Sequence, residues 1–255
     1  GSGKTTTARI LAAGFNCQNG ATHSPCGECQ NCLDILNERC IDIVEIDAAS
    51  KNGVDDIREM QQSASTVPSQ VRTKFYIIDE CHQMSSSAQN ALLKTLEEPP
   101  AHVVFILCTT EPEKLKDTIL SRCQVCEFRR ITAEKIADHL GWICEQEKYT
   151  ADREALAAIA RSTAGGMRDA IVKLATAMCD ADDGHITETI VSPIIGNAGL
   201  EDCSRLVDAI INKDVYEIFR VIGSIADSTA SLQPFYMGLL TYFRNMMALV
   251  TNPKI

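Results

Sequence analysis

The chain lacks the features that would place it in several large classes of protein. It has no apolar run of about 18 residues or more, the length that a membrane-spanning helix needs, so no transmembrane helix is expected. It has no internal repeats and no low-complexity tract, so a repeat array is not expected either. Positive charge is also scarce, since 24 Lys and Arg face 34 Asp and Glu, a net charge of −10 at pH 7. This balance argues against a surface generally coated by nucleic acid, but it leaves room for a local basic site within an assembly.

Cysteine, by contrast, is abundant. The 255 residues include 12 cysteines. In a secreted chain below about 100 residues this count would indicate a disulfide framework. In a chain of this length it favours metal binding together with scattered buried thiols, and therefore a reducing cytoplasm.

The order of apolar segments divides the chain into three regions. Up to residue 130, strand patterns rich in Val, Ile and Phe alternate with helix patterns, which predicts a parallel sheet covered by helices on both faces. Residues 131–194 predict a small all-helical domain, and residues 195–255 a second helical region that we expect to be cut short. The strands are expected at 42–46, 74–80, 102–110 and 123–128, with a further strand before residue 1.

The opening GSGKTT matches only the second half of the phosphate-binding loop G-x-x-x-x-G-K-[ST]. Gly3, Lys4 and Thr5 fit the motif, Gly1 would fall inside the loop, and the first loop glycine would lie upstream. A Gly-Ser-Gly start is also typical of a linker left by cloning. The rest of the chain has to decide between these two interpretations.

The acidic pair in IIDECH favours the loop. Asp79 and Glu80 end a predicted buried strand, where phosphate-loop proteins place one acid that holds Mg²⁺ and a second that orients the attacking water. Two surface acids in a turn are the alternative, but the half-motif lies upstream with a strand–helix unit between. Lys4 is then expected to reach the β- and γ-phosphates and Thr5 to bind Mg²⁺. The predicted nucleotide-binding residues are Gly1, Ser2, Gly3, Lys4, Thr5 and Thr6.

Four cysteines form a cluster with the spacing C-x8-C-x2-C-x2-C. Four thiolates suit a closed tetrahedral zinc site, which would be structural because no position is left for water. An iron–sulfur run is the alternative, but it would continue with x3-C-P, and position 36 is Leu36. Cys123 and Cys126 form a further C-x-x-C pair, which we interpret as residues on opposite faces of a strand. The predicted zinc ligands are Cys17, Cys26, Cys29 and Cys32.

Two arginines are candidates for sensing a nucleotide. Arg122 comes just before the fourth predicted strand, whereas the phosphate loop lies at the carboxyl ends of the strands, too far for Arg122 to reach the nucleotide of its own chain. It is either a structural arginine or an arginine finger offered to the ATP of a neighbouring subunit. Arg168 starts a helix in AGGMRDA, where it would either contact a γ-phosphate or be a solvated arginine paired with Asp169.

Several characteristic segments follow one another along the chain in this order: GSGKTTTARILA, the four-cysteine segment, DIVEIDAAS, IIDECHQMS, NALLKTLEEPP, TTEPEKL, SRC and GGMRDA. Together they closely resemble the γ/τ subunit family of the bacterial DNA polymerase III clamp loader, over residues 1–195 and more loosely beyond. The resemblance implies an AAA+ fold, with a RecA-like α/β domain at 1–130, a zinc module at 17–32, a helical lid at 131–194 and a truncated helical collar at 195–255. It also implies a pentameric loader in which ATP binding opens a ring-shaped sliding clamp and primed DNA triggers hydrolysis.

The same resemblance implies roles for individual residues. Thr5 and Asp79 are expected to hold Mg²⁺, and Lys51 and Arg58 to contact DNA. Where the family often has a third basic residue between those two, this chain has Gly53, which predicts a weaker or displaced DNA contact. The implied catalytic set is Lys4, Asp79, Glu80, Thr110 as a polar sensor, Arg122 acting in trans and Arg168 as a lid sensor.

We therefore expect an ATP-hydrolysing motor subunit that uses ATP, Mg²⁺ and Zn²⁺ in the bacterial cytoplasm. Its expected partners are δ, δ′, further γ/τ copies, the sliding clamp and primer–template DNA, and no membrane. No polymerase carboxylate signature occurs, so no polymerase active site is expected on this chain. The alternatives are a non-hydrolysing scaffold like δ′, and a different AAA+ machine such as a helicase loader or unfoldase. The intact Lys4, Thr5, Asp79 and Glu80 favour the motor.

Overall fold

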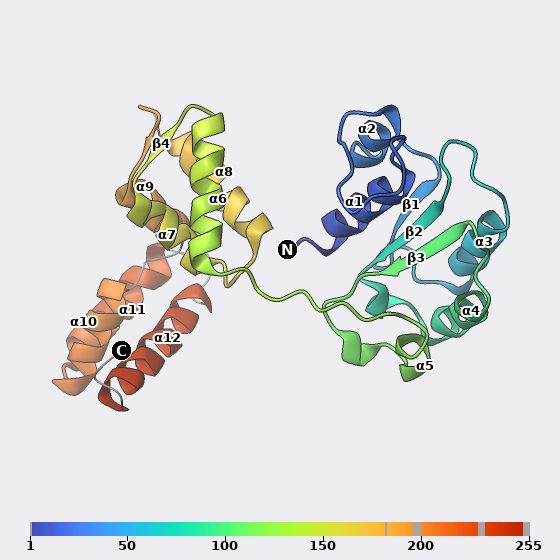
Figure 1. Ribbon diagram of the computed structural model, residues 1–255. Helices are drawn as coiled ribbons and strands as arrows, with labels where there is room; N and C mark the ends of the chain where they lie inside the picture. Colours follow the sequence, from blue (N-terminus) through green and yellow to red (C-terminus); the bar gives the residue numbers. More distant parts are fainter. Residues whose placement is uncertain (1, 182, 196–199, 229–232, 252–255) are drawn as a thin grey trace. The chain divides into compact units, whose positions relative to one another are not determined.

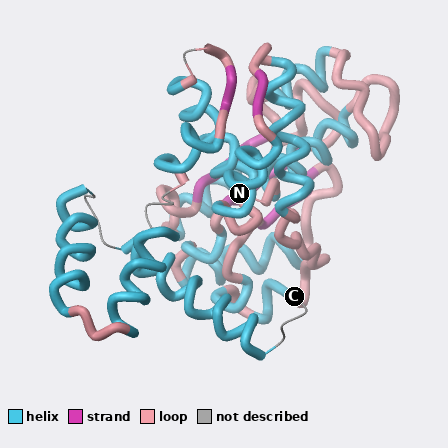
Figure 2. Tube along the Cα trace, turned by 90° about the vertical axis from the view of Figure 1, so that its left-hand side faces the viewer, coloured by secondary structure: helices cyan, strands magenta, loops and turns pink. Residues whose placement is uncertain are grey.

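The computed structural model describes residues 2–181, 183–195, 200–228 and 233–251. These residues form two compact units, one of residues 3–128 and one of Ser2 together with the residues from 129 onward (Figure 1). The strands are short stretches in a mostly helical chain (Figure 2). Among the described residues, no helix is both long and apolar enough to cross a lipid bilayer.

The first unit alternates strands and helices, as the sequence predicts. Its three strands form one parallel sheet in the order β1-β2-β3, in which Ile43 pairs with Phe75 and Lys74 with Val103. The elements in chain order are α1 (Lys4–Asn16), α2 (Gln30–Leu36), β1 (Ile43–Asp47), α3 (Val54–Ala64), β2 (Lys74–Asp79), the short 3-10 helix η1 (Cys81–Gln83), α4 (Ser86–Glu97), β3 (Val103–Leu107), the 3-10 helix η2 (Pro112–Lys114) and α5 (Asp117–Leu120).

The central strand β2 shows why this sheet needs helices on both faces. Successive side chains of a strand point to opposite faces, and Lys74–Ile78 are all buried. Phe75 and Ile77 belong to clusters with buried alanines of α1, whereas Tyr76 and Ile78 belong to a cluster with α3 and α4. Figure 1 shows α1 and α2 on one side of the strands and α3 and α4 on the other. The unit is therefore a three-layer α/β/α structure.

The strand predicted at 123–128 is wrong. The segment has no regular secondary structure, and no described strand pairs with it, since β1 and β3 are the edges of the sheet. A strand needs a neighbour with which to exchange backbone hydrogen bonds, and the residue types in CQVCEF cannot reveal whether one is present. The prediction that Cys123 and Cys126 lie on opposite faces of a strand falls with it.

The second unit is almost entirely helical. The one sheet among its described residues is a parallel pair of two-residue strands, in which Thr150 pairs with His185. Strands this short are not visible in the sequence pattern. The elements are α6 (Ala133–Gln146), β4 (Thr150–Ala151), α7 (Arg153–Ser162), α8 (Met167–Asp180), β5 (His185–Ile186), α9 (Glu188–Ile194), α10 (Leu200–Ile211), α11 (Val215–Ser228) and α12 (Gln233–Thr251).

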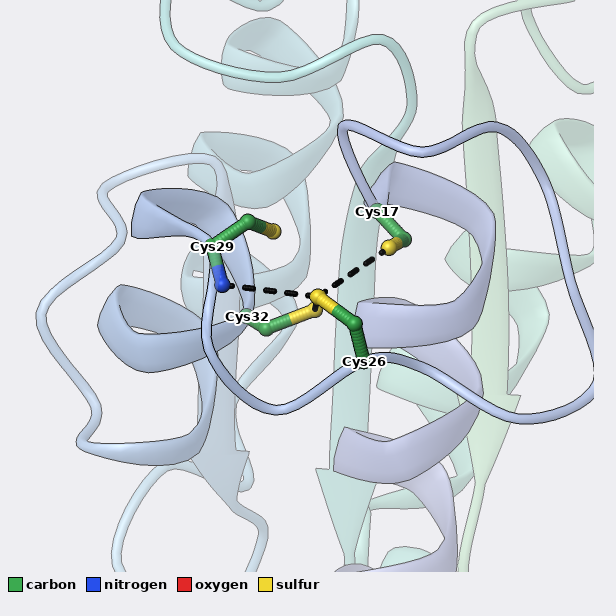
Figure 3. A group of neighbouring side chains, drawn as sticks. All are labelled: Cys17, Cys26, Cys29 and Cys32. Atoms are coloured by element: carbon green, nitrogen blue, oxygen red, sulfur yellow. Dashed lines mark hydrogen bonds between the residues drawn. The ribbon is translucent and has the colours of Figure 1, made fainter.

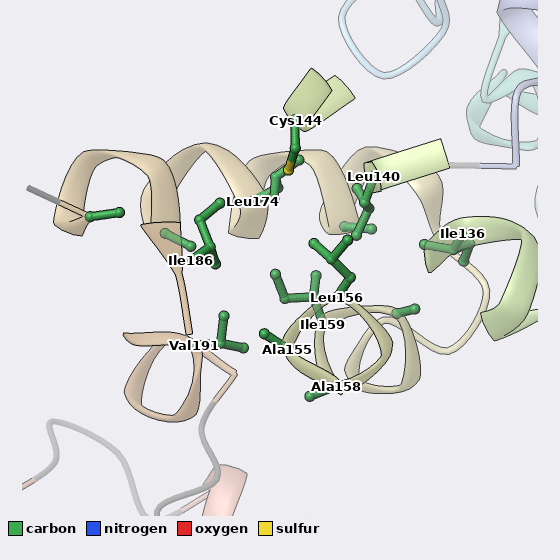
Figure 4. Close-up of a cluster of buried hydrophobic side chains, with 14 residues drawn as sticks. Ile136, Leu140, Cys144, Ala155, Leu156, Ala158, Ile159, Leu174, Ile186 and Val191 are labelled. Atoms are coloured by element: carbon green, nitrogen blue, oxygen red, sulfur yellow. The ribbon is translucent and has the colours of Figure 1, made fainter. Parts of the chain in front are cut away.

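Two separate apolar cores stabilise the second unit. The larger one joins α6, α7, α8 and α9, with fully buried Leu140, Ile159 and Leu174 among its members (Figure 4). The smaller one joins α10 and α11 through Leu206 and Val221, and the end of α12 nearest Gln233 packs against it. The division between helices up to Ile194 and those from Leu200 onward thus corresponds to two cores.

Candidate functional site

The start of α1 meets the end of β2. The hydroxyl of Thr5 donates a hydrogen bond to a carboxylate oxygen of Asp79 at 2.9 Å, across 74 residues of sequence. Gly3 precedes the helix with φ 83°, a left-handed conformation that glycine adopts without a steric cost. The two halves of the predicted magnesium site therefore lie together at the carboxyl end of a central strand.

The first turn of α1 offers free backbone amides to a ligand. The first amides of any helix have no partner within the helix, and no described side chain caps those of α1. With the positive end of the helix dipole, these amides form a site suited to phosphate. Ser2 and Gly3 precede this turn and Thr6 lies within it, whereas Gly1 lies outside the described residues.

The charges of this region act on the pKa of the Cys108 thiol, which lies directly after β3. Burial raises its pKa to about 11, the negative charges of Asp79 and Glu80 add to the rise, and the positive charge of Lys4 opposes it. Lys4, Asp79 and Glu80 therefore all lie within electrostatic reach of one buried sulfur. Lys4 begins α1 next to Thr5, which contacts Asp79, so the predicted lysine and both predicted acids lie at the same edge of the sheet.

Glu80 has an unusual backbone for a residue other than glycine. Its φ of 45° and ψ of 42° lie in the left-handed region, which costs free energy in a residue other than glycine. Its amide donates to Asp79 at 3.0 Å, and its carboxylate accepts a hydrogen bond from the Thr110 hydroxyl at 3.1 Å. The predicted sensor and the predicted base are therefore in direct contact.

His82 is a neighbour of this pair that the sequence reasoning missed. Its Nδ1 lies 3.3 Å from Glu80 Oε2, and its Nε2 lies 3.3 Å from Glu111 Oε2. The signal was present in the sequence, because His82 and Glu111 follow the ends of β2 and β3. Neighbouring parallel strands end at the same edge of a sheet, so their following residues meet there.

Arg122 does not precede a strand, but it is firmly held. Its Nη2 lies 2.7 Å from Glu97 Oε1, and its Nη1 donates to the Thr118 carbonyl at 2.8 Å. Its side chain is 35% exposed, so it is still partly open to a neighbour. The ion pair with Glu97 is a contact that the sequence reasoning did not anticipate.

Arg168 lies in the second unit, at the start of α8. It is exposed, and among the described residues it forms no ion pair, so the alternative pairing with Asp169 is not present. The Asp169 carboxylate instead lies beside Gly166, where a Cβ would come within 2.6 Å of its Oδ2. Among the described residues, no acid therefore forms an ion pair with the Arg168 guanidinium.

The predicted DNA contacts lie around the start of α3. Lys51 is exposed, and Arg58 is exposed but forms an ion pair with Asp55 at 3.1 Å. The helix begins at Val54 after Gly53, and the Asp56 carboxylate accepts a hydrogen bond from the Gly53 amide at 3.0 Å. Acids thus compete for the basic groups and amides that would hold a phosphate.

The four predicted zinc ligands lie together beside α1 and α2 (Figure 3). Their sulfurs all lie within 4.8 Å of one another, with Cys17 and Cys26 3.6 Å apart and Cys26 and Cys32 3.9 Å apart. Four sulfurs bound tetrahedrally at about 2.3 Å from one ion lie about 3.8 Å apart. The cluster therefore has the size and donor set of a tetrahedral metal site.

Backbone hydrogen bonds lower the pKa of two of the four thiols, Cys17 and Cys29. The Cys29 amide points at the Cys26 sulfur at 3.4 Å. Hydrogen bonds from the backbone at Gln18 and Cys32 lower the pKa of Cys29 to about 6, whereas burial raises the pKa of Cys32 to about 12. Thiolates are the form in which cysteine binds metal, so these amides suit the ligand role.

Comparison with known structures defines the class of protein. The Thermotoga maritima RuvB Holliday junction branch migration motor has a similar fold, with a TM-score of 0.53 at 15% identity over 77% of this chain and 68% of that one. A structure of a single-residue variant of the same RuvB matches 83% of this chain and 74% of its own, with the same TM-score. With the parallel sheet and the helical lid, this likeness defines an AAA+ fold, as the sequence predicts.

Sequence comparison then defines the family. The family model described as DNA polymerase III, delta subunit, matches residues 1–132, and the model of the DNA polymerase III clamp loader subunit, ATPase lid domain, matches residues 135–174. DNA polymerase III subunit tau of Bacillus subtilis is 39% identical over 255 residues, all of this chain and 45% of the relative. Subunit gamma of Buchnera aphidicola (strain Bp) is 36% identical over all of this chain and 69% of its own length.

The chain belongs to the γ/τ family of DNA polymerase III subunits. It spans less than half of some relatives, such as subunit tau of Escherichia coli, which is 40% identical over 226 residues, 89% of this chain and 35% of that protein.

Proposed function

We propose that this chain is an ATP-hydrolysing motor subunit of a clamp loader, which opens a sliding clamp and places it on primer–template DNA. The observation that supports this most strongly is the contact of Thr5 with Asp79 next to the contact of Thr110 with Glu80. A scaffold subunit that does not hydrolyse ATP has no need to keep both contacts at one strand edge. Family membership supplies the clamp-loader context.

In this proposal the phosphates of ATP bind at the start of α1, with Lys4 beside the β- and γ-phosphates. Thr5 and Asp79 hold Mg²⁺, which would offset the charge of the phosphates. Glu80 orients the attacking water, and the Thr110 hydroxyl turns from Glu80 towards the γ-phosphate. Thr5 is already within contact distance of Asp79, and Thr110 of Glu80.

Arg122 completes the site of a neighbouring subunit. Glu97 and the Thr118 carbonyl hold its guanidinium while leaving it partly exposed. An arginine finger supplied in this way stabilises the charge of the transition state. Arg168 reports on the nucleotide from the lid domain. The domains are residues 1–130, 131–194 and 195–255, and the last of these assembles with other subunits.

The four cysteines hold a structural zinc ion, because all four positions are filled by sulfur and none is left for water. The partners are δ, δ′, further γ/τ copies, the clamp and primed DNA, in the bacterial cytoplasm. Lys51 and Arg58 contribute a small DNA contact, weakened by the ion pair of Arg58 with Asp55. A weak contact per subunit is consistent with the net charge of −10.

ATP hydrolysis by the full-length parent protein, mixed with its partner subunits, tests the proposal. We expect strong stimulation by clamp and primed DNA together. Arg122→Ala should remove most of that stimulation with little change in nucleotide affinity, whereas Arg39→Ala, an exposed arginine of the same unit, should have no effect. Nucleotide binding without stimulated turnover would instead support a scaffold or another AAA+ machine. Equal losses of affinity and turnover in Arg122→Ala would make Arg122 a structural residue.

A further inference from the structure

The side chain of His82 lies between two carboxylates. It is only 10% exposed, and its two ring nitrogens each lie 3.3 Å from a carboxylate oxygen, Nδ1 from Glu80 and Nε2 from Glu111. Nδ1 also lies 3.0 Å from the Thr109 hydroxyl. Both polar ends of a nearly buried ring therefore have partners, and one of these partners is the proposed water-orienting acid.

The far side of the ring is anchored independently of Glu80. Lys114 forms an ion pair with Glu111 at 2.5 Å, and this hydrogen bond holds the pKa of the Glu111 carboxyl below its usual value. The Glu111 amide donates to the Thr109 hydroxyl at 2.9 Å. The two groups that contact His82 from the segment after β3 are thus tied to each other and to Lys114, so the ring has a fixed support.

The contacts of Glu80 are all on one side of its carboxylate. Thr110 and His82 both meet Oε2, whereas Oε1 accepts no hydrogen bond from the described residues. A carboxylate held by one oxygen keeps the other free for a water molecule. When Thr110 turns to a γ-phosphate, His82 is the remaining side chain on Oε2.

We propose that His82 is a positioning residue, which keeps the Glu80 carboxylate oriented for the attacking water while Thr110 contacts the nucleotide. This inference rests on the proposed ATP hydrolysis. The opposing possibility is that His82 only fastens the segment 109–114 to the end of β2 through Thr109 and Glu111, in which case the loss of hydrolysis rate in each variant should follow its loss of melting temperature.

Amide side chains can separate the two nitrogens. The amide nitrogen of asparagine can take the place of Nδ1, and that of glutamine the place of Nε2. His82→Asn therefore keeps a donor towards Glu80 and Thr109, whereas His82→Gln keeps one towards Glu111. His82→Ala removes both. The three variants of the full-length protein are compared in the complete loader, with clamp and primed DNA, by single-turnover hydrolysis, nucleotide affinity and melting temperature.

We expect His82→Ala to lower the hydrolysis rate about 10- to 100-fold, since a misplacement of a catalytic group by about 1 Å costs up to that much, with nucleotide affinity within about twofold of the original. His82→Asn should recover most of the rate and His82→Gln little of it. Recovery by His82→Gln alone, or an unchanged rate in His82→Ala, would overturn the inference. If His82→Ala does not fold, the hydrolysis rates of the Asn and Gln variants decide, provided that their melting temperatures are equal.

An original protein without stimulated hydrolysis would overturn the proposed function, and this inference with it. If the unsubstituted protein is active but the hydrolysis rates of the three variants do not follow the expected order, only the inference is overturned.

Discussion

Two regions of the first unit differ in the interactions that stabilise them. The edge where β2 and β3 end rests on a packed apolar core and carries its polar groups in pairs, such as Thr5 with Asp79. The four-cysteine segment consists of irregular backbone and the short helix α2, and its centre is a group of sulfurs. We therefore expect the first region to stay folded when it loses a functional group, and we propose that the second depends on a bound ion for its own structure.

The change with the largest expected effect is Glu80→Gln. An amide cannot accept a proton from water and orients it poorly, so hydrolysis in the loader should fall about 10²- to 10⁴-fold. The melting temperature and nucleotide affinity should hardly change, because glutamine has the same shape and can still accept the Thr110 hydrogen bond. A large fall in the melting temperature of Glu80→Gln would show that this region cannot lose a functional group and stay folded.

Removal of the metal should lower the stability of the protein, which Glu80→Gln should leave nearly unchanged. The parent protein as purified should contain about one zinc ion per chain and be colourless, since zinc has a filled d shell. With free zinc about 1,000-fold above its dissociation constant, the ion contributes about 4 kcal/mol to the free energy of unfolding. Cys26→Ser should remove most of this stabilisation, measured by metal content and denaturant titration. Cys179→Ser, an exposed cysteine of α8, is the matched control and should change neither.

A brown protein that contains iron would contradict the zinc assignment. A Cys26→Ser protein that keeps its metal and its stability would show that the cluster is not a closed four-ligand site.

A smaller effect on stability should come from a change in the apolar core beside the edge where β2 and β3 end. Leu92 of α4 is fully buried in the cluster that includes Tyr76 and Ile78. Leu92→Ala should lower the free energy of unfolding by about 3 kcal/mol, because it removes buried methyl groups and leaves a cavity. Zinc content should not change, since the cysteines pack on the other face of the sheet. Loss of zinc from Leu92→Ala would show that the two regions unfold together.

The sequence predicts local patterns better than contacts between residues that are far apart in the chain. The phosphate loop, the acids at the end of β2 and the four cysteines are local patterns whose chemistry is set by residue type and spacing, and the structure brings each of these groups together. The strand at 123–128 was wrong because a strand depends on a partner elsewhere in the chain. The ion pair of Arg122 with Glu97 was missed because it depends on side-chain directions, which spacing alone does not give. The position of His82 between two acids was missed although His82 and Glu111 follow the ends of neighbouring strands.

Clamp loading itself tests the account most directly. The full-length protein is assembled with its partner subunits, and the amount of clamp left on primed circular DNA is measured after addition of ATP. We predict loading by the original protein and almost none by a loader in which every copy carries Lys4→Ala, with assembly of the complex unchanged. Equal loading by the Lys4→Ala loader would contradict the account, because the chain would then be a scaffold and not the motor.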